Sequence, residues 1–244
     1  MKTKYLISTF ILIGALLLSG CGSAARVGAL QNESQSVKLG DAKSVRVDIN
    51  FGAGTLEVTG GAENLLDADF TYNVAKLKPE VEYTDGTLVV RQPEVNGLPA
   101  VLGITDFRNE WGLHLDNEVP MDLSVDVGAG TSNLKLGSLS LSGLKITLGA
   151  TQGTIDLSGN WPHDLDVTID AGASDLNLLL PSDVGVRVEV DRGPTVIEAP
   201  EMTQNGNVYT NAAYGESGVT LRISLSAGVG LINLAIKEAA AAPE

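Results

Sequence analysis

Apolar and polar residues alternate in short stretches from about Val45 to Ile236. Glycine, asparagine and proline interrupt these stretches, and no long segment carries apolar residues at helical spacing. An alternation of period two gives a strand one face in a core and one face in water. The sequence therefore predicts an all-β domain.

The alternating stretches recur with a fixed period of 21 residues. Residues 121–204 divide into four rows that align without gaps, a fifth row begins at Val219 after an insertion, and a divergent copy opens at Val45. One apolar column of the four rows consists of Val125, Ile146, Val167 and Val188. Such self-similarity indicates a repeat architecture.

Strand–corner–strand units of this length are typical of a β-solenoid, in which each coil stacks on the last and like residues form columns. We therefore expect a right-handed β-solenoid with a 21-residue repeat. Lys145, Asp166 and Arg187 share one outward column, and stacking would bring these opposite charges together. An antiparallel β-sandwich or roll made of hairpins shows the same alternation and is the alternative.

A small-residue break, as in "IDAGASDLNL", separates the two strands of each row. Seven residues separate the last inward residue before the break from an inward residue after it, and an odd spacing requires a bend or bulge. Five of the six copies have glycine at the same place: Gly54, Gly130, Gly172, Gly193 and Gly228. No helix follows these glycines, so we interpret them as structural corners and not as a phosphate loop.

The N-terminal stretch "MKTKYLISTFILIGALLLSGC" resembles a bacterial lipoprotein signal. Two lysines precede an apolar run that is shorter than the ~20 residues of a membrane span, and the run ends in a four-residue lipobox. The resemblance implies that residues 1–20 are cleaved and that Cys21 is acylated, with palmitate among its chains. Cys21 is the only cysteine, so the chain forms no internal disulfide.

Four further segments follow from these patterns. Residues 21–43 are small and polar and are predicted to be a lipidated flexible tether. Residues 44–118 form a divergent N-terminal β region, and residues 119–237 carry the solenoid repeats with an inserted loop at 200–218. Residues 238–244 are predicted to be a disordered tail.

The chain has a formal net charge of −14, which disfavours nucleic acid and anionic lipid headgroups as partners. We therefore expect membrane attachment through lipid chains alone. The two histidines, His114 and His163, lie apart in the sequence, and no Cys or His cluster could hold a metal or cofactor.

Two groups of charged residues raise the alternatives of a calcium site and of a lyase-like groove. Aspartates crowd one repeat at Asp164, Asp166, Asp170 and Asp175, and we interpret them as solvated positions in preference to a calcium site. A lyase-like groove would need an acid–base pair beside Arg187, Arg192 and Arg222, and the sequence does not bring such a pair together.

The loop at 200–218 contains Tyr209 and Tyr214. Loops inserted in solenoids often lie on the binding face, and tyrosines suit contacts with protein or glycan. Tyr209, Tyr214 and Trp111 are therefore the candidate partner-binding residues, and a loop that only caps the coils is the alternative.

The rows, the "VGAG" and "DAGAS" corners and the lead-in "NEWGLHLDNEVPMDLSVDVGAG" together resemble the toast-rack, adhesin-like β-helical domains of bacterial envelope lipoproteins, which are related to cell-wall-active antibiotic response proteins. The resemblance implies a β-helix-like fold outside the cytoplasm and supplies no catalytic motif. We expect a non-enzymatic, membrane-anchored lipoprotein with an adhesin-like or scaffolding role at the cell envelope. The alternatives are an envelope-stress accessory and a glycan-cleaving β-helix enzyme.

Overall fold

The computed structural model describes residues 27–94 and 106–238. Within these ranges the regular structure is β-strand apart from a short 3-10 helix, η1 (Ala75–Leu77). The strands are β1 (Gln31–Val37), β2 (Val45–Gly60), β3 (Leu66–Tyr72), β4 (Glu80–Thr84), β5 (Thr87–Arg91), β6 (Asn109–Leu115), β7 (Met121–Lys135), β8 (Leu141–Asp156), β9 (Leu165–Ala173), β10 (Asp175–Pro181), β11 (Gly185–Arg192), β12 (Thr195–Glu198), β13 (Thr203–Asn205), β14 (Val208–Thr210) and β15 (Thr220–Lys237). The predicted all-β class is confirmed. No helix in the described ranges is long and apolar enough to cross a membrane.

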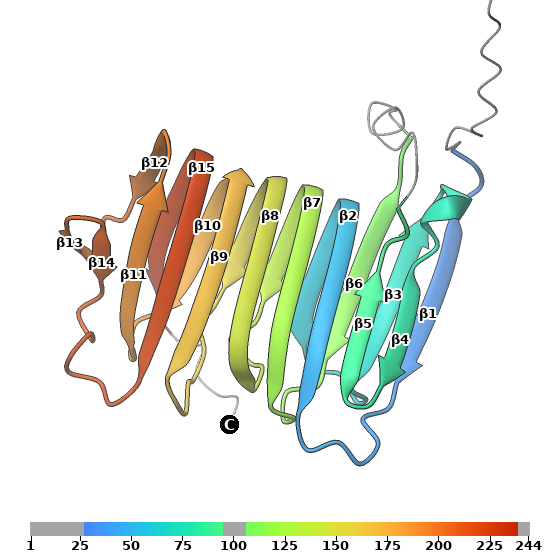
Figure 1. The fold of residues 1–244 in the computed structure, drawn as a ribbon, viewed down its shortest axis with the longest axis horizontal. Helices are drawn as coiled ribbons and strands as arrows, with labels where there is room; N and C mark the ends of the chain where they lie inside the picture. Colours follow the sequence, from blue (N-terminus) through green and yellow to red (C-terminus); the bar gives the residue numbers. More distant parts are fainter. Residues whose placement is uncertain (1–26, 95–105, 239–244) are drawn as a thin grey trace, which may run out of the picture.

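The strands form two layers that face each other, and neighbouring strands stand side by side within each layer (Figure 1). The long strands β2, β7, β8 and β15 run through both layers: residues 46–50 of β2 pair with β5, and residues 55–60 pair with β6. Two shorter pairs, β9 with β10 and β11 with β12, each supply one strand to either layer. We call the layer of β9 and β11 the first layer and that of β10 and β12 the second. Their inward faces meet in one apolar core.

Neighbouring strands in the centre of the molecule are parallel, from β2 through β7, β8 and β9 to β15 and β11. Antiparallel pairs occur towards the ends, where β1, β3 and β6 pair at one end and β11, β14 and β13 at the other. An antiparallel sandwich of hairpins therefore does not describe the centre.

The 21-residue register holds between β7 and β8, where Val125 pairs with Ile146. Between β8 and β9 the register changes by two residues, so that Ile146 pairs with Ile169 and not with Val167. A shift of two keeps every side chain on its original face, because successive strand residues alternate between faces. The apolar alternation therefore fits both registers equally well.

The rows also do not stack in chain order. The last strand, β15, lies between β9 and β11, and Ile223 pairs with Val167 on one side and Val188 on the other. The predicted single column is therefore corrected. The residues that do follow one another across the first layer are Ile49, Val125, Ile146, Ile169, Leu225 and Val190. A solenoid wound strictly in chain order is not confirmed, whereas parallel stacking of bent units is observed.

The corner glycines lie in two files where the strands pass between layers. Gly54 and Gly130 share one file, and both have a positive φ, of 131° and 117°. Gly172, Gly228 and Gly193 belong to the other file. The five glycines predicted to share one place come from both files, because the two-residue change of register between β8 and β9 could not be seen in the sequence. In each file the strands approach so closely that a Cβ on Gly130 or Gly228 would overlap a neighbouring backbone carbonyl.

Two predicted segments differ from their expected form. Part of the proposed tether, Gln31–Val37, is the strand β1 and pairs along its whole length with β3. The loop at 200–218 contains β13 and β14, and β14 pairs with the free edge of β11. Residues 1–20, Cys21 and residues 239–244 lie outside the described residues.

Candidate functional site

The three aromatic candidates do not lie together on one surface. Trp111 is 2% exposed, and its ring contacts Phe51 and Phe70 edge-on. Tyr209 is 5% exposed and lies in β14 beside Val188. Both rings are therefore part of the core, which corrects their assignment as partner-binding residues. Tyr214 remains on the surface with 42% of its area exposed.

The aspartates of the third row do not converge on one point. Asp164 accepts a hydrogen bond from Arg222 at 2.6 Å, and this contact lowers the pKa of Asp164 below its ordinary value. Asp175 accepts a hydrogen bond from the backbone of Leu231. No group of three His, Cys, Asp or Glu side chains within the described ranges has the arrangement of a metal site.

Two of the three arginines considered for a lyase are occupied by other contacts, and the side chain of Arg192 lies outside the part of the structure that is described. Arg187 pairs with Glu189 at 2.9 Å, and Arg222 with Asp164. His114 shares a hydrogen bond with Thr59, and His163 contacts the backbone oxygen of Asp164. None of these contacts brings an acid and a base together beside a free arginine.

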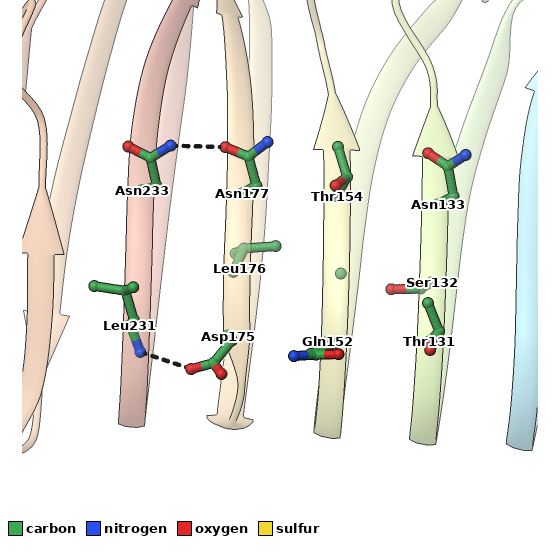
Figure 2. Close-up of a pocket in the computed structure, with 11 residues that line it drawn as sticks. Thr131, Ser132, Asn133, Gln152, Thr154, Asp175, Leu176, Asn177, Leu231 and Asn233 are labelled. Carbon is green, nitrogen blue, oxygen red and sulfur yellow. Dashed lines mark hydrogen bonds between the residues drawn. The ribbon is translucent and has the colours of Figure 1, made fainter.

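A different group of side chains does gather, on the outer face of the second layer (Figure 2). The parallel register sets outward residues of β7, β8, β10 and β15 in two rows. The amide row consists of Asn133, Thr154, Asn177 and Asn233. The second row consists of Thr131, Gln152, Asp175 and Leu231. Apart from Asp175, these eight side chains are uncharged.

The two rows border a shallow groove of about 380 Å³. Gly153 lies at its centre, with Ser132 on β7 on one side and Leu176 on β10 on the other. Ser132 points towards the strand that carries Gly153 in Figure 2. A Cβ on Gly153 would lie 2.6 Å from the Ser132 hydroxyl oxygen and 3.9 Å from Leu176 Cδ1, both of buried residues, so the glycine leaves room on the core side of the sheet.

Ser132 is 2% exposed and shares the core-facing side of β7 with Leu134; its Oγ is the one buried side-chain nitrogen or oxygen of the described residues that has no hydrogen bond. The side chains of the two rows lie on the opposite face, and several of their polar groups lack a protein partner. The side chains of Gln152 and Thr154 form no hydrogen bond with another described residue. Asn233 donates to the Oδ1 of Asn177 at 2.9 Å, which leaves the Asn177 amide N–H groups directed along the row. The groove therefore offers donors and acceptors that the fold itself does not use.

Charged groups lie beyond the amide row and are paired with one another. Lys135 contacts Glu57 at 2.9 Å, and Lys237 contacts Asp156 at 2.7 Å. Burial alone would raise the pKa of Asp156, but hydrogen bonds from Lys237 and Ser158 outweigh it and lower the pKa below its ordinary value. Both lysines are thus paired with carboxylates.

Comparison with known proteins identifies the family. Residues 26–179, more than half of the chain, match the family described as the N-terminal domain of toast_rack, DUF2154. The chain belongs to the toast-rack family. A search of curated protein sequences gives no significant match to this toast-rack protein.

Two solved structures resemble this chain to very different degrees. A candidate cell adhesion protein from Clostridium sporogenes is 28% identical, has a TM-score of 0.80, and is matched over 100% of its length and 86% of this toast-rack chain. A candidate adhesin from Bacteroides fragilis is 12% identical over 84% of this chain and 97% of its own, with a TM-score of 0.37. Of these two, only the Clostridium protein is similar enough in structure to support a conclusion about this chain.

Sequence reasoning missed the groove of the toast-rack protein for an identifiable reason. Thr131 and Gln152 are 21 residues apart, but their neighbour on β10 is Asp175, which follows Gln152 by 23. The fourth wall comes from β15, which stands last in the sequence. The sequence indicated only that the amide row faces outward, since Asn133, Thr154, Asn177 and Asn233 each lie one residue from an apolar residue of their strand.

Proposed function

We propose that this toast-rack protein is a non-enzymatic adhesive module that lies outside the cytoplasm and binds an envelope protein or glycan. The observation that carries the proposal is its likeness to the Clostridium protein, at 28% identity and over that protein's whole length. The described residues add support, because their polar surface groups form extended rows and not a converging catalytic set.

Attachment to the membrane through acylated Cys21 is the second part of the proposal. The first described strand, β1, begins at Gln31, ten residues after the cysteine. A chain of that length can extend by roughly 30 Å, which is enough to hold the sheet clear of lipid headgroups. Membrane anchoring would then present both outer sheet faces to a partner.

Adhesion is tested with cells that produce the full chain and cells that lack it. Producing cells should adhere more strongly to surfaces coated with isolated cell envelopes, and a plasmid copy of the gene should restore adhesion to the deleted strain. External protease should degrade the protein in intact producing cells. Equal adhesion of both strains, together with resistance to external protease, would refute the proposed role.

Anchoring is tested with Cys21→Ala. The unchanged chain should sediment with membranes and take up labelled palmitate, whereas Cys21→Ala should incorporate no label and leave the washed membrane fraction. Retention of the variant on washed membranes would show that Cys21 is not the anchor.

A further inference from the structure

We propose that the groove of the second layer is a binding site for a neutral, extended glycan, which lies across β7, β8, β10 and β15. This inference rests on the proposed adhesive function and names the ligand class and the site. It is carried by the uncharged amide and hydroxyl rows, by the groove that they border, and by the side chains of Gln152 and Thr154, which form no hydrogen bond with another described residue.

The position of the groove favours a ligand that is read by side chains. The strands β7, β8, β10 and β15 all have a paired neighbour on each side in this layer. Their backbone N–H and C=O groups are therefore already used in the sheet, and a peptide strand could not add to them by main-chain pairing. The groups that remain available for hydrogen bonds to a ligand are side-chain amides and hydroxyls, which suit a ligand rich in hydroxyl groups.

The charge of the site favours a neutral glycan over an anionic one. No arginine or lysine lines the groove, and its one charged side chain is Asp175. The whole chain has a net charge of −14, which repels polyanions. Acidic polysaccharides are therefore disfavoured, whereas a neutral hydroxyl can donate to Asp175 and to the amide oxygens.

The spacing of the row fits an extended chain of repeating units. Adjacent parallel strands lie ~4.8 Å apart, so Asn133, Thr154, Asn177 and Asn233 offer a polar group at each such step. This step is close to the length of one pyranose unit in an extended β-linked glycan. Leu231 is 40% exposed at the groove border and can contact the apolar face of a sugar ring.

The experiment is calorimetric titration of the full acylated chain in detergent micelles with cellotetraose and chitotetraose. We expect binding of at least one of them and no binding of a heparin tetrasaccharide. The variants Gln152→Leu and Asn177→Leu remove amides without a large change in size, and each should weaken binding about three- to tenfold. The matched control is Asn50→Leu, which removes an exposed amide from the outer face of the first layer and should leave binding unchanged.

Three results would overturn the inference: no binding of either neutral tetrasaccharide, binding of heparin alone, or equal affinity of the groove variants and the unchanged chain. A loss of affinity in Asn50→Leu as large as in the groove variants would also show that the ligand binds elsewhere. Thermal midpoints of all variants are recorded so that a loss of fold is not counted as a loss of contact. Cell adhesion without glycan binding would overturn this inference and leave the proposed function intact, whereas unchanged adhesion of the deleted strain, together with resistance to external protease, would remove the proposed function itself.

Discussion

Asn233 donates a hydrogen bond from its Nδ2 to the Oδ1 of Asn177 at 2.9 Å, although the two residues are 56 positions apart in the chain. The contact exists because β15, the last strand, pairs with β10 in parallel and in register. The end of the chain thus completes the polar groove in the middle of the molecule. The amide row of the groove depends on this insertion.

Ser132→Ala tests whether the core face of β7 retains an unpartnered hydroxyl at a cost in stability. Removing a buried hydroxyl that has no partner should raise the free energy of unfolding of the unliganded protein by about 1 kcal/mol. Denaturant unfolding of the two proteins measures the difference. Ser226→Ala, at an exposed position, is the control and should change stability by less than about 0.5 kcal/mol. A destabilised Ser132→Ala would mean that the hydroxyl has a partner in solution.

The sequence was sufficient to predict the class of fold and the bent repeating unit. Alternation with period two defines which residues face the core, and the odd spacing across the break requires the phase change that the structure shows between Ala53 and Leu56, both buried. Alternation carries no information about a shift of two residues. The register of Ile146 with Ile169 could therefore not be read from it.

The order of the strands in the sheet could not be predicted from the sequence either. All rows have the same apolar face, so a row can stack on any other, and nothing in the pattern distinguishes β11 from β15 as the neighbour of β9. The groove was missed because it depends on both the shift and the insertion. The aromatic residues of the loop were assigned to binding from their chemistry, but the pairing of β14 with β11 buries Tyr209.

Glycine substitutions test the close approach of the strands at the corners. Gly130→Ala should destabilise the protein by about 3 kcal/mol or more, because a Cβ would overlap the carbonyl of Gly54 and φ is positive. Gly206 has a positive φ and open space, so Gly206→Ala should cost only about 1–2 kcal/mol. Gly218→Ala, with neither constraint, is the control. Equal stability of all three variants by denaturant unfolding would contradict the packing of the corner.

The two loop tyrosines should differ sharply. Tyr209→Ala removes a buried ring that packs on β11 and should lower the free energy of unfolding by about 3 kcal/mol. Tyr214→Ala removes an exposed ring and should lower it by less than about 1 kcal/mol. Thermal and denaturant unfolding measure both changes. A larger loss in Tyr214→Ala would contradict the role of β14 as a cover for the edge of β11.

Asp156 should make the free energy of unfolding depend on pH in the acidic range. Its pKa is lower in the folded than in the unfolded protein, so its contribution to stability is present above the unfolded value of about 3.9 and is lost as the pH falls towards the folded value. The difference in unfolding free energy between the unchanged protein and Asp156→Asn should therefore shrink below about pH 4. Asp126→Asn, which removes an exposed carboxylate, is the matched control. A difference that stays constant from pH 7 to pH 3 would contradict the Lys237 contact.

The central claim is that β15 stands between the third and fourth rows and forms one wall of the groove. Chain-order stacking would make residues 177 and 198 neighbours, whereas the structure places Asn233 next to both Asn177 and Glu198. The most direct test is cross-linking of two double-cysteine variants by a short methanethiosulfonate reagent, in chains that also carry Cys21→Ser. Asn177→Cys with Asn233→Cys should cross-link rapidly, and Asn177→Cys with Glu198→Cys should not. Efficient cross-linking of the 177–198 pair, with little of the 177–233 pair, would contradict the order of the strands and the groove built on it.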